Sequence, residues 1–245
     1  MATSTLDNPH SDTTRRHTFL TSSIGAKLVV AITGLLLLLY LFIHLAGNLL
    51  ILLGPTTFNA YSDLLIKNPL IVPVEIGLAI IFLLHISRAL ANWRTNAQAR
   101  PTSYYQASRR MFGYGWAGGS SRKSASSTWM VGSGLFTLFF VIVHVRQFRF
   151  GAEYAIVVAG RQMNDLYRIE MEVFSNPLVV LAYVFAIIVV ATHLWHGISS
   201  ALQSLGVDHP RLTVIILRGG RIISYVIAIG FIFVPIWALV TGGRS

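Results

Sequence analysis

The feature that most constrains this chain is a set of five apolar stretches, each long enough to cross a lipid bilayer. A transmembrane helix needs about 20 consecutive, predominantly apolar residues. The first stretch contains LLLLLYLFIHLAGNLLILLG at residues 35–54. The sequence predicts an all-α polytopic membrane protein, in which a polar tail (residues 1–26) precedes one transmembrane domain (residues 27–242). The predicted spans are residues 27–53, 70–93, 129–150, 177–205 and 212–240.

Composition narrows the class further. The chain is 54% apolar and only 11% charged, and it lacks the alternating ten-residue segments of a β-barrel. It has no cysteine, so any iron–sulfur cluster or thiolate-bound haem must belong to a partner. The net charge of +10 comes from basic residues spread over short loops, which favours a role in membrane topology over nucleic-acid binding.

The basic residues also predict an orientation. With the N-terminus in the cytoplasm, the inner side holds thirteen of the 19 Lys and Arg residues and the outer side holds six. Cytoplasmic loops are enriched in Lys and Arg, so we expect the N-terminus inside and the C-terminus outside a cytoplasmic (inner) membrane.

Histidines interrupt four of the five spans. An ionisable side chain inside a span is costly, so it is expected to face the protein interior and to have a function. With a rise of 1.5 Å per residue, His44 and His144 lie about 9–12 Å from the outer surface. His85 and His193 lie about 12–15 Å from the inner surface. The predicted arrangement is an outer pair and an inner pair, separated by about 5–10 Å.

Two imidazoles that face each other in apolar surroundings suit a b-type haem with two histidine ligands. Zinc or a di-iron site would need more ligands at one level, often carboxylates. His196 lies near the same level as His193, and depth alone does not separate them. Arg88 and Arg146 are candidates to pair with haem propionates, or they extend to the interface as topology anchors.

Two glycines lie close to these histidines in the sequence. Gly47 follows His44 by three residues, and Gly197 follows His193 by four. They provide room for a macrocycle, or they are ordinary helix-packing glycines.

A series of segments resembles the cytochrome b subunit of succinate:quinone oxidoreductases, in its single-subunit, five-helix form with two haems. The segments follow one another over nearly the whole chain after the tail. They are SSIGAKLVVAITG, HLAGNL, FNAYSDLLIKNPL, FLLHISRAL, ARPTSYYQ, VIVHVRQFRF and HLWHGISSALQSLGVDHPR.

This resemblance implies a function and a set of ligands. His44 and His144 would bind an outer haem b, and His85 and His193 an inner one, with four helices forming the haem bundle. The resemblance favours His193 over His196 because a glycine follows it by four residues. The partners implied are a flavoprotein subunit, which carries the succinate or fumarate chemistry, and an iron–sulfur subunit on the cytoplasmic face. The tail and the basic segment 94–128 are candidate docking surfaces. Electrons would pass between the iron–sulfur subunit and a membrane quinone, which we expect to be menaquinone.

Quinone chemistry also needs proton donors or acceptors near the quinone oxygens. On the outer side the candidates are Tyr61, Asp63 and Glu75, and on the inner side they are Ser23, Lys27 and Arg88. Glu75 has an alternative role as the ion-pair partner of a loop base such as Lys67.

Two other classes of protein fit part of the pattern. A diheme anchor of a hydrogenase or formate dehydrogenase would share the four histidines but lack the FNAYSDLL and HPR segments. A transporter with a histidine relay would place ionisable residues along one path, whereas here they fall at two levels.

Overall fold

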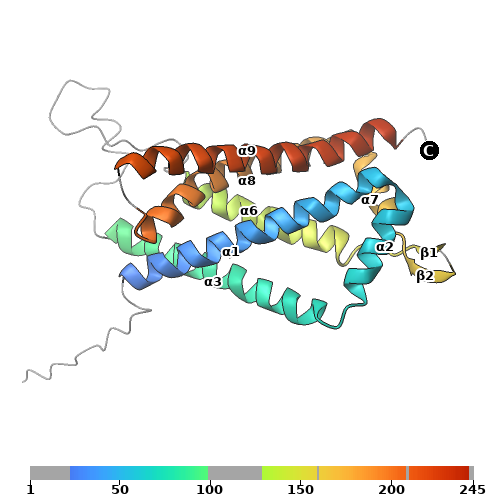
Figure 1. Cartoon of the computed structure of the whole chain (residues 1–245), viewed down its shortest axis with the longest axis horizontal. Coiled ribbons are helices and arrows are strands. Elements are labelled where there is room, and N and C mark those ends of the chain that lie inside the picture. Colours follow the sequence, from blue (N-terminus) through green and yellow to red (C-terminus); the bar gives the residue numbers. More distant parts are fainter. Residues whose placement is uncertain (1–22, 99–128, 159, 208–209, 243–245) are drawn as a thin grey trace, which may run out of the picture.

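The computed structural model describes residues 23–98, 129–158, 160–207 and 210–242. In this part of the chain, five helices are long and apolar enough to cross a membrane, so the protein is a multi-pass membrane protein. These helices run side by side along the long axis of the molecule (Figure 1). They are α1 (Ser23–Leu49, continued by the 3-10 turn Leu50–Leu53), α3 (Ile71–Gln98), α6 (Met130–Phe148), α8 (Pro177–Ser204) and α9 (Pro210–Thr241).

Each predicted span coincides with one of these helices, with boundaries that shift by up to five residues. The largest difference is in α3, which continues to Gln98 where the span was expected to end at residue 93. The predicted tail is outside the described residues up to residue 22, and the basic segment 94–128 is outside them from residue 99. Their expected role as docking surfaces therefore stays a prediction.

Four of the helices form a closed ring. Helix α1 packs against α3 and α8, and α6 completes the ring by packing against α8 and α3. Helices α1 and α6 are therefore diagonal to each other, as are α3 and α8. Large apolar side chains such as Leu83, Ile142 and Leu181 are exposed on the outside of the ring, as expected for a surface in contact with lipid.

Helix α9 packs outside the ring, against α8 and α1. Two glycines allow the close approach. A Cβ atom on Gly220 would lie 3.0 Å from Ser199 Oγ of α8, and one on Gly230 would lie 2.7 Å from Leu45 Cδ2 of α1. Small residues at helix crossings let backbones approach in membranes, where packing replaces the hydrophobic driving force.

The connections at one end of the bundle are structured, although the sequence predicted only loops at residues 54–68 and 151–176. They contain α2 (Pro55–Ile66), the antiparallel strands β1 (Ala155–Val158) and β2 (Arg161–Asn164), and α7 (Leu166–Phe174). These elements gather at one end of the long helices, which we call the capped end (Figure 1). The described chain is therefore not entirely helical, although the hairpin has only two strands of four residues each.

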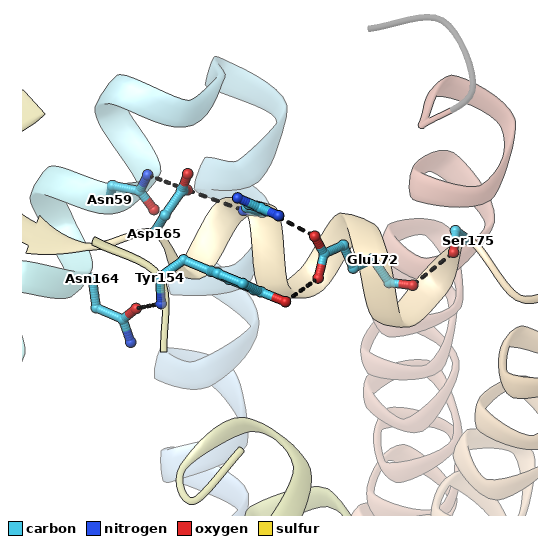
Figure 2. Close-up of polar contacts among 7 residues, drawn as sticks. Asn59, Tyr154, Asn164, Asp165, Glu172 and Ser175 are labelled. Atoms are coloured by element: carbon cyan, nitrogen blue, oxygen red, sulfur yellow. Dashed lines mark hydrogen bonds and ion pairs between the residues drawn. The ribbon is translucent and has the colours of Figure 1, made fainter. Parts of the chain in front are cut away.

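A hydrogen-bond network joins the elements of the capped end (Figure 2). Asn59 on α2 is fully buried, and its amide donates to Asp165 Oδ1 at 2.7 Å and accepts from the backbone N–H of Tyr167 at 2.9 Å. Asp165 is also the N-cap of α7, where it accepts from the backbone N–H of Arg168. A single buried amide therefore connects α2 to the start of a helix more than 100 residues later.

The exposed side of α7 carries a charged cluster that consists of Arg168, Glu172 and the neighbouring Tyr154. Arg168 donates to Glu172 at 2.7 Å, Tyr154 donates to the same carboxylate at 2.7 Å, and the guanidinium lies 4.0 Å above the Tyr154 ring. The hydrogen bond from Arg168 lowers the pKa of Glu172, and the hydrogen bond to Glu172 raises the pKa of Tyr154. This cluster fixes the chain that leads into the hairpin against the surface of α7.

Candidate functional site

The histidine pair nearer the capped end consists of His44 on α1 and His144 on α6, the two diagonal helices of the ring. Their ring centroids are 5.8 Å apart, and the ring planes are nearly perpendicular, at 83°. A metal–imidazole bond is about 2.0 Å long and the ring centroid lies about 1 Å further on, so two imidazoles on one metal have centroids about 6 Å apart. The two rings are in edge-to-face contact, and their separation is also close to that of two imidazoles that would share one metal.

Aromatic rings surround this pair. Tyr40 stacks on His44 at 5.4 Å with the planes only 12° apart, and Phe231 of α9 lies 5.6 Å from the same ring. The rings around His144 are Phe140, Phe148 and Tyr183, at 5.7, 5.2 and 6.1 Å. The histidines therefore lie in mainly aromatic surroundings.

Hydrogen bonding at this pair is sparse. Asn48 donates to the backbone carbonyl of His44 at 2.8 Å, and its amide nitrogen lies 3.4 and 3.5 Å from the two ring nitrogens. The Nδ1 atom of His144 is buried and has no hydrogen-bond partner among the described residues. A buried nitrogen without a partner is uncommon, and such a group calls for an explanation.

The second pair consists of His85 on α3 and His193 on α8, the other two diagonal helices. His193 lies within electrostatic range of both His85 and His196. Each ring is held by a hydroxyl from a neighbouring helix: Thr33 Oγ1 lies 3.1 Å from His85 Nδ1, and Ser133 Oγ lies 3.1 Å from His193 Nδ1. The hydroxyl contact distinguishes His193 from His196, for which depth alone left the choice open.

The two pairs are further apart than the 5–10 Å expected from the sequence. His85 lies at the level of Thr33 on α1, and His44 lies eleven residues further along the same helix. Eleven residues correspond to about 16 Å along the helix axis. The expectation was too small because it fitted each span into a hydrocarbon core of about 30 Å, whereas α1 and its 3-10 continuation extend beyond such a core.

Gly47 and Gly197 do not line the histidine rings. A Cβ atom on Gly47 would lie 2.9 Å from the Tyr61 hydroxyl, so this glycine makes room for α2. A Cβ atom on Gly197 would be in ordinary contact with Met130. The packing interpretation is supported for Gly47, whereas the contacts of Gly197 do not decide between the two interpretations.

The glycines that approach the histidines are Gly34 and Gly134, which the sequence reasoning missed. A Cβ atom there would lie 3.1 Å from His85 Cε1 and 3.3 Å from His193 Cε1, respectively. Each directly follows a hydroxyl residue, in the pairs Thr33–Gly34 and Ser133–Gly134. A comparison of the first and third predicted spans, aligned on their histidines, would have revealed both glycines.

The predicted quinone residues at the capped end separate into two groups. Tyr61 and Glu75 both interact electrostatically with Tyr40, whose ring stacks on His44. Asp63 instead forms an ion pair with Lys67 at 2.7 Å, and Lys67 also donates to the backbone carbonyl of Gln162 in the hairpin.

Glu75 forms an ion pair, as its alternative role predicted, but the partner is Arg149 and not Lys67. Its carboxylate pairs with Arg149, at the end of α6, through bonds of 3.0 and 3.3 Å, and Lys67 pairs elsewhere. The sequence pointed to Lys67 because it is only eight residues away, whereas the fold brings α6 beside the start of α3. The pair is about half exposed and links two helices of the ring.

The remaining predicted residues lie near the helix ends or one turn from a histidine. Arg88 is half-buried, one turn beyond His85 on α3. Arg146 is exposed and donates to the backbone carbonyl of Phe150. Lys27 is exposed in the first turns of α1, and Ser23 is the first residue of that helix. Two contacts that the sequence suggested therefore stay predictions: the pairing of either arginine with a propionate and the inner-side quinone pocket.

A groove of about 820 Å³ lies at the capped end between α6, α7 and α8. Its polar lining includes Arg146, Gln147 and Tyr183, and the Tyr183 hydroxyl donates to Gln147 at 2.6 Å. None of the predicted acids Asp63 and Glu75 lines it. Tyr183 also lies 6.1 Å from the His144 ring, although neither His44 nor His144 lines the groove.

No protein-family model, curated protein or solved structure matches this chain. Among the described residues, no group of three or more His, Asp or Glu side chains could hold a metal ion. The candidate site therefore consists of the histidines on two pairs of diagonal helices.

Proposed function

We propose that this chain is the membrane anchor and diheme cytochrome b subunit of a succinate dehydrogenase or fumarate reductase. It would bind two haem b groups, at His44–His144 and at His85–His193, and exchange electrons with a membrane quinone, menaquinone being our expectation. The observation that carries the proposal is the pairing of four intramembrane histidines across both diagonals of one helix ring, at two levels. A haem at each pair would supply reversible one-electron chemistry within the membrane.

The residues of the chain have defined roles in this proposal. The four imidazoles would bind as axial ligands, and the aromatic rings around His44 and His144 would exclude water. Tyr61 and Glu75, or alternatively Tyr183 and Gln147 in the groove, would exchange protons with a quinone at the capped end. These two sets flank the same histidine pair from different sides, so variants can separate them.

Orientation and partners belong to the same proposal. With the N-terminus in the cytoplasm, the capped end faces outward and the His85–His193 pair lies nearer the cytoplasm. An iron–sulfur subunit would dock on that inner face, and it would connect the anchor to a flavoprotein subunit that carries the succinate or fumarate chemistry. Support comes from the excess of basic residues on the predicted inner side.

A reduced-minus-oxidised absorption spectrum of the purified protein, combined with a haem count, tests the proposal. We expect b-type bands and two haems per chain. A colourless protein would favour a histidine-relay transporter, and one haem per chain would contradict the two-pair arrangement. Co-purification of a flavoprotein with succinate-oxidising activity would separate this anchor from the anchor of a hydrogenase or formate dehydrogenase.

A further inference from the structure

The contacts of Thr33 and Ser133 carry information about the protonation of the histidines that they touch. Both hydroxyls are buried, and each lies 3.1 Å from the Nδ1 atom of its histidine. A hydroxyl has one hydrogen to donate and two lone pairs with which to accept. If the hydroxyl donates its hydrogen to another acceptor, it can only accept from the imidazole, and the Nδ1 atom must then carry a hydrogen.

The Thr33 hydroxyl donates to the backbone carbonyl of Val29, one turn earlier on α1, at 2.6 Å. Because its hydrogen is used in this short bond, Thr33 accepts from His85, and the backbone carbonyl of Val30 is a second acceptor for the same ring. We infer that the hydrogen of the neutral imidazole is on Nδ1. Ser133 on α6 likewise donates to the carbonyl of Met130, at 3.1 Å, and the same carbonyl also accepts a hydrogen bond from the His193 ring. His193 is then held in the same tautomer.

This tautomer leaves a lone pair on Nε2, the nitrogen that then coordinates metal, while the hydrogen bond at Nδ1 orients the ring. The glycines that follow the two hydroxyl residues leave room for the imidazole rings. Any side chain at Gly34 or Gly134 would put a Cβ atom 3.1 or 3.3 Å from the Cε1 atom of the neighbouring imidazole. A hydroxyl therefore orients each ring, and the glycine that follows the hydroxyl residue leaves space for the ring.

The same pattern occurs on both helices at the same register. A hydroxyl residue and a glycine stand at positions 33–34 and again at 133–134, and a histidine follows the hydroxyl residue by eleven positions in each case. Eleven residues are close to three helical turns, so hydroxyl and histidine share one face. Helices α1 and α6 thus each contribute a histidine to one pair and a hydroxyl support to the other.

We propose that Thr33 and Ser133 are positioning residues: they hold His85 and His193 with Nε2 free to bind one metal centre, and they tune the reduction potential of the haem at that pair. The proposal rests on the proposed function, because it assumes a haem there. A hydrogen bond at Nδ1–H makes an imidazole more basic and so a stronger donor to iron, which favours the oxidised state and lowers the potential. In the described part of the chain, no serine or threonine hydroxyl contacts the rings of His44 and His144.

The test is a potentiometric titration of haem absorbance on the purified complex, with haem counted in every sample. Thr33→Val and Ser133→Ala remove a hydroxyl at nearly constant volume. We expect each to raise the midpoint potential of one haem and to leave the other unchanged. The haem that shifts should be the one that disappears in His193→Ala.

Two control variants make the result specific. Thr33→Ser keeps a hydroxyl and should behave like the wild type. Thr137→Val removes a hydroxyl that donates to the carbonyl of Ser133 on the same helix, and it should leave both potentials unchanged. Loss of the haem from Thr33→Val but not from Thr33→Ser would also support positioning.

The outcomes separate the two proposals. Unchanged potentials in Thr33→Val and Ser133→Ala, with both haems retained, would overturn the positioning role and leave the proposed function intact. Equal behaviour of Thr33→Ser and Thr33→Val, or an equal shift in Thr137→Val, would overturn it as well. A wild-type complex without haem would overturn the proposed function and the positioning role together.

Discussion

The two histidine pairs use the same side chain but are held in different ways. Rings pack around the His44–His144 pair, and its hydrogen bonds are few. The His85–His193 pair is oriented by two hydroxyls, each bonded to its own helix backbone. Stacking restricts a ring but leaves its tautomer open, whereas a hydrogen bond from Nδ1 selects one tautomer. The difference predicts that two otherwise similar sites respond to different substitutions.

The largest expected effect is the loss of one haem when a single histidine of either pair is replaced. If each pair binds the proposed haem, His144→Ala should remove the haem between α1 and α6 and leave the other in place, and His193→Ala should do the opposite, because each removes one of two proposed ligands. A pyridine haemochrome assay on the purified protein would show one haem per chain in each variant. His196→Ala is the matched control and should keep both. Loss of a haem from His196→Ala, with both retained in His193→Ala, would reverse the assignment.

The capped end should also carry a pH-dependent contribution to stability. Glu170 on α7 is 6% exposed, its Oε2 atom has no partner among the described residues, and burial raises its pKa from 4.5 to about 8. A raised carboxyl pKa contributes stability below pH 4.5 that is lost as the pH rises to 8, by roughly 1.4 kcal/mol per unit and about 5 kcal/mol at most.

Glu170→Gln should therefore flatten the dependence of the melting temperature on pH between pH 5 and pH 9, measured by circular dichroism in detergent. The matched control is Glu172→Gln, two residues away on the same helix, because Glu172 is exposed and its pKa is lowered by the hydrogen bond from Arg168. This control should leave most of the dependence in place. A wild-type melting temperature that does not fall over this range would show that Glu170 is not buried as described.

A smaller effect tests the stacking around the first pair. Tyr40→Leu removes the ring that stacks on His44, an interaction worth about 0.5–1.5 kcal/mol beyond burial. We expect a shift in the potential of the His44–His144 haem and none in that of the His85–His193 haem. Tyr40→Phe keeps the ring and should behave as the wild type in redox titrations. A shift in both potentials would mean that the two pairs are not independently supported.

The smallest effect on stability concerns Glu75. Its ion pair with Arg149 is about half exposed, so Glu75→Gln should cost no more than about 1 kcal/mol of stability. If Glu75 exchanges protons with the quinone, the same variant should lower quinone reduction while the haem content and melting temperature stay close to the wild type. Arg149→Gln breaks the same ion pair and serves as the control. Full activity in Glu75→Gln would exclude the residue from the quinone site and favour the groove lined by Tyr183.

The membrane spans could be predicted closely because a bilayer imposes one requirement, a long apolar segment that satisfies its own backbone hydrogen bonds. The capped end could not be predicted in the same way. Helices α2 and α7 are short, and they are held by contacts such as that between Asn59 and Asp165, which are 106 residues apart in sequence. The partner of Glu75 was missed for the same reason, since Arg149 is 74 residues away.

Hydropathy and the positions of four histidines were enough to predict five spans and two histidine levels, because both depend on spacing along a regular helix. The rotation of each helix and the choice of its neighbours came only from tertiary packing. Packing put α1 diagonal to α6 and α3 diagonal to α8, and it brought Thr33 and Ser133 against imidazoles on other helices. Interactions between helices depend on side-chain fit across the bundle, which the order of residues in one span does not specify.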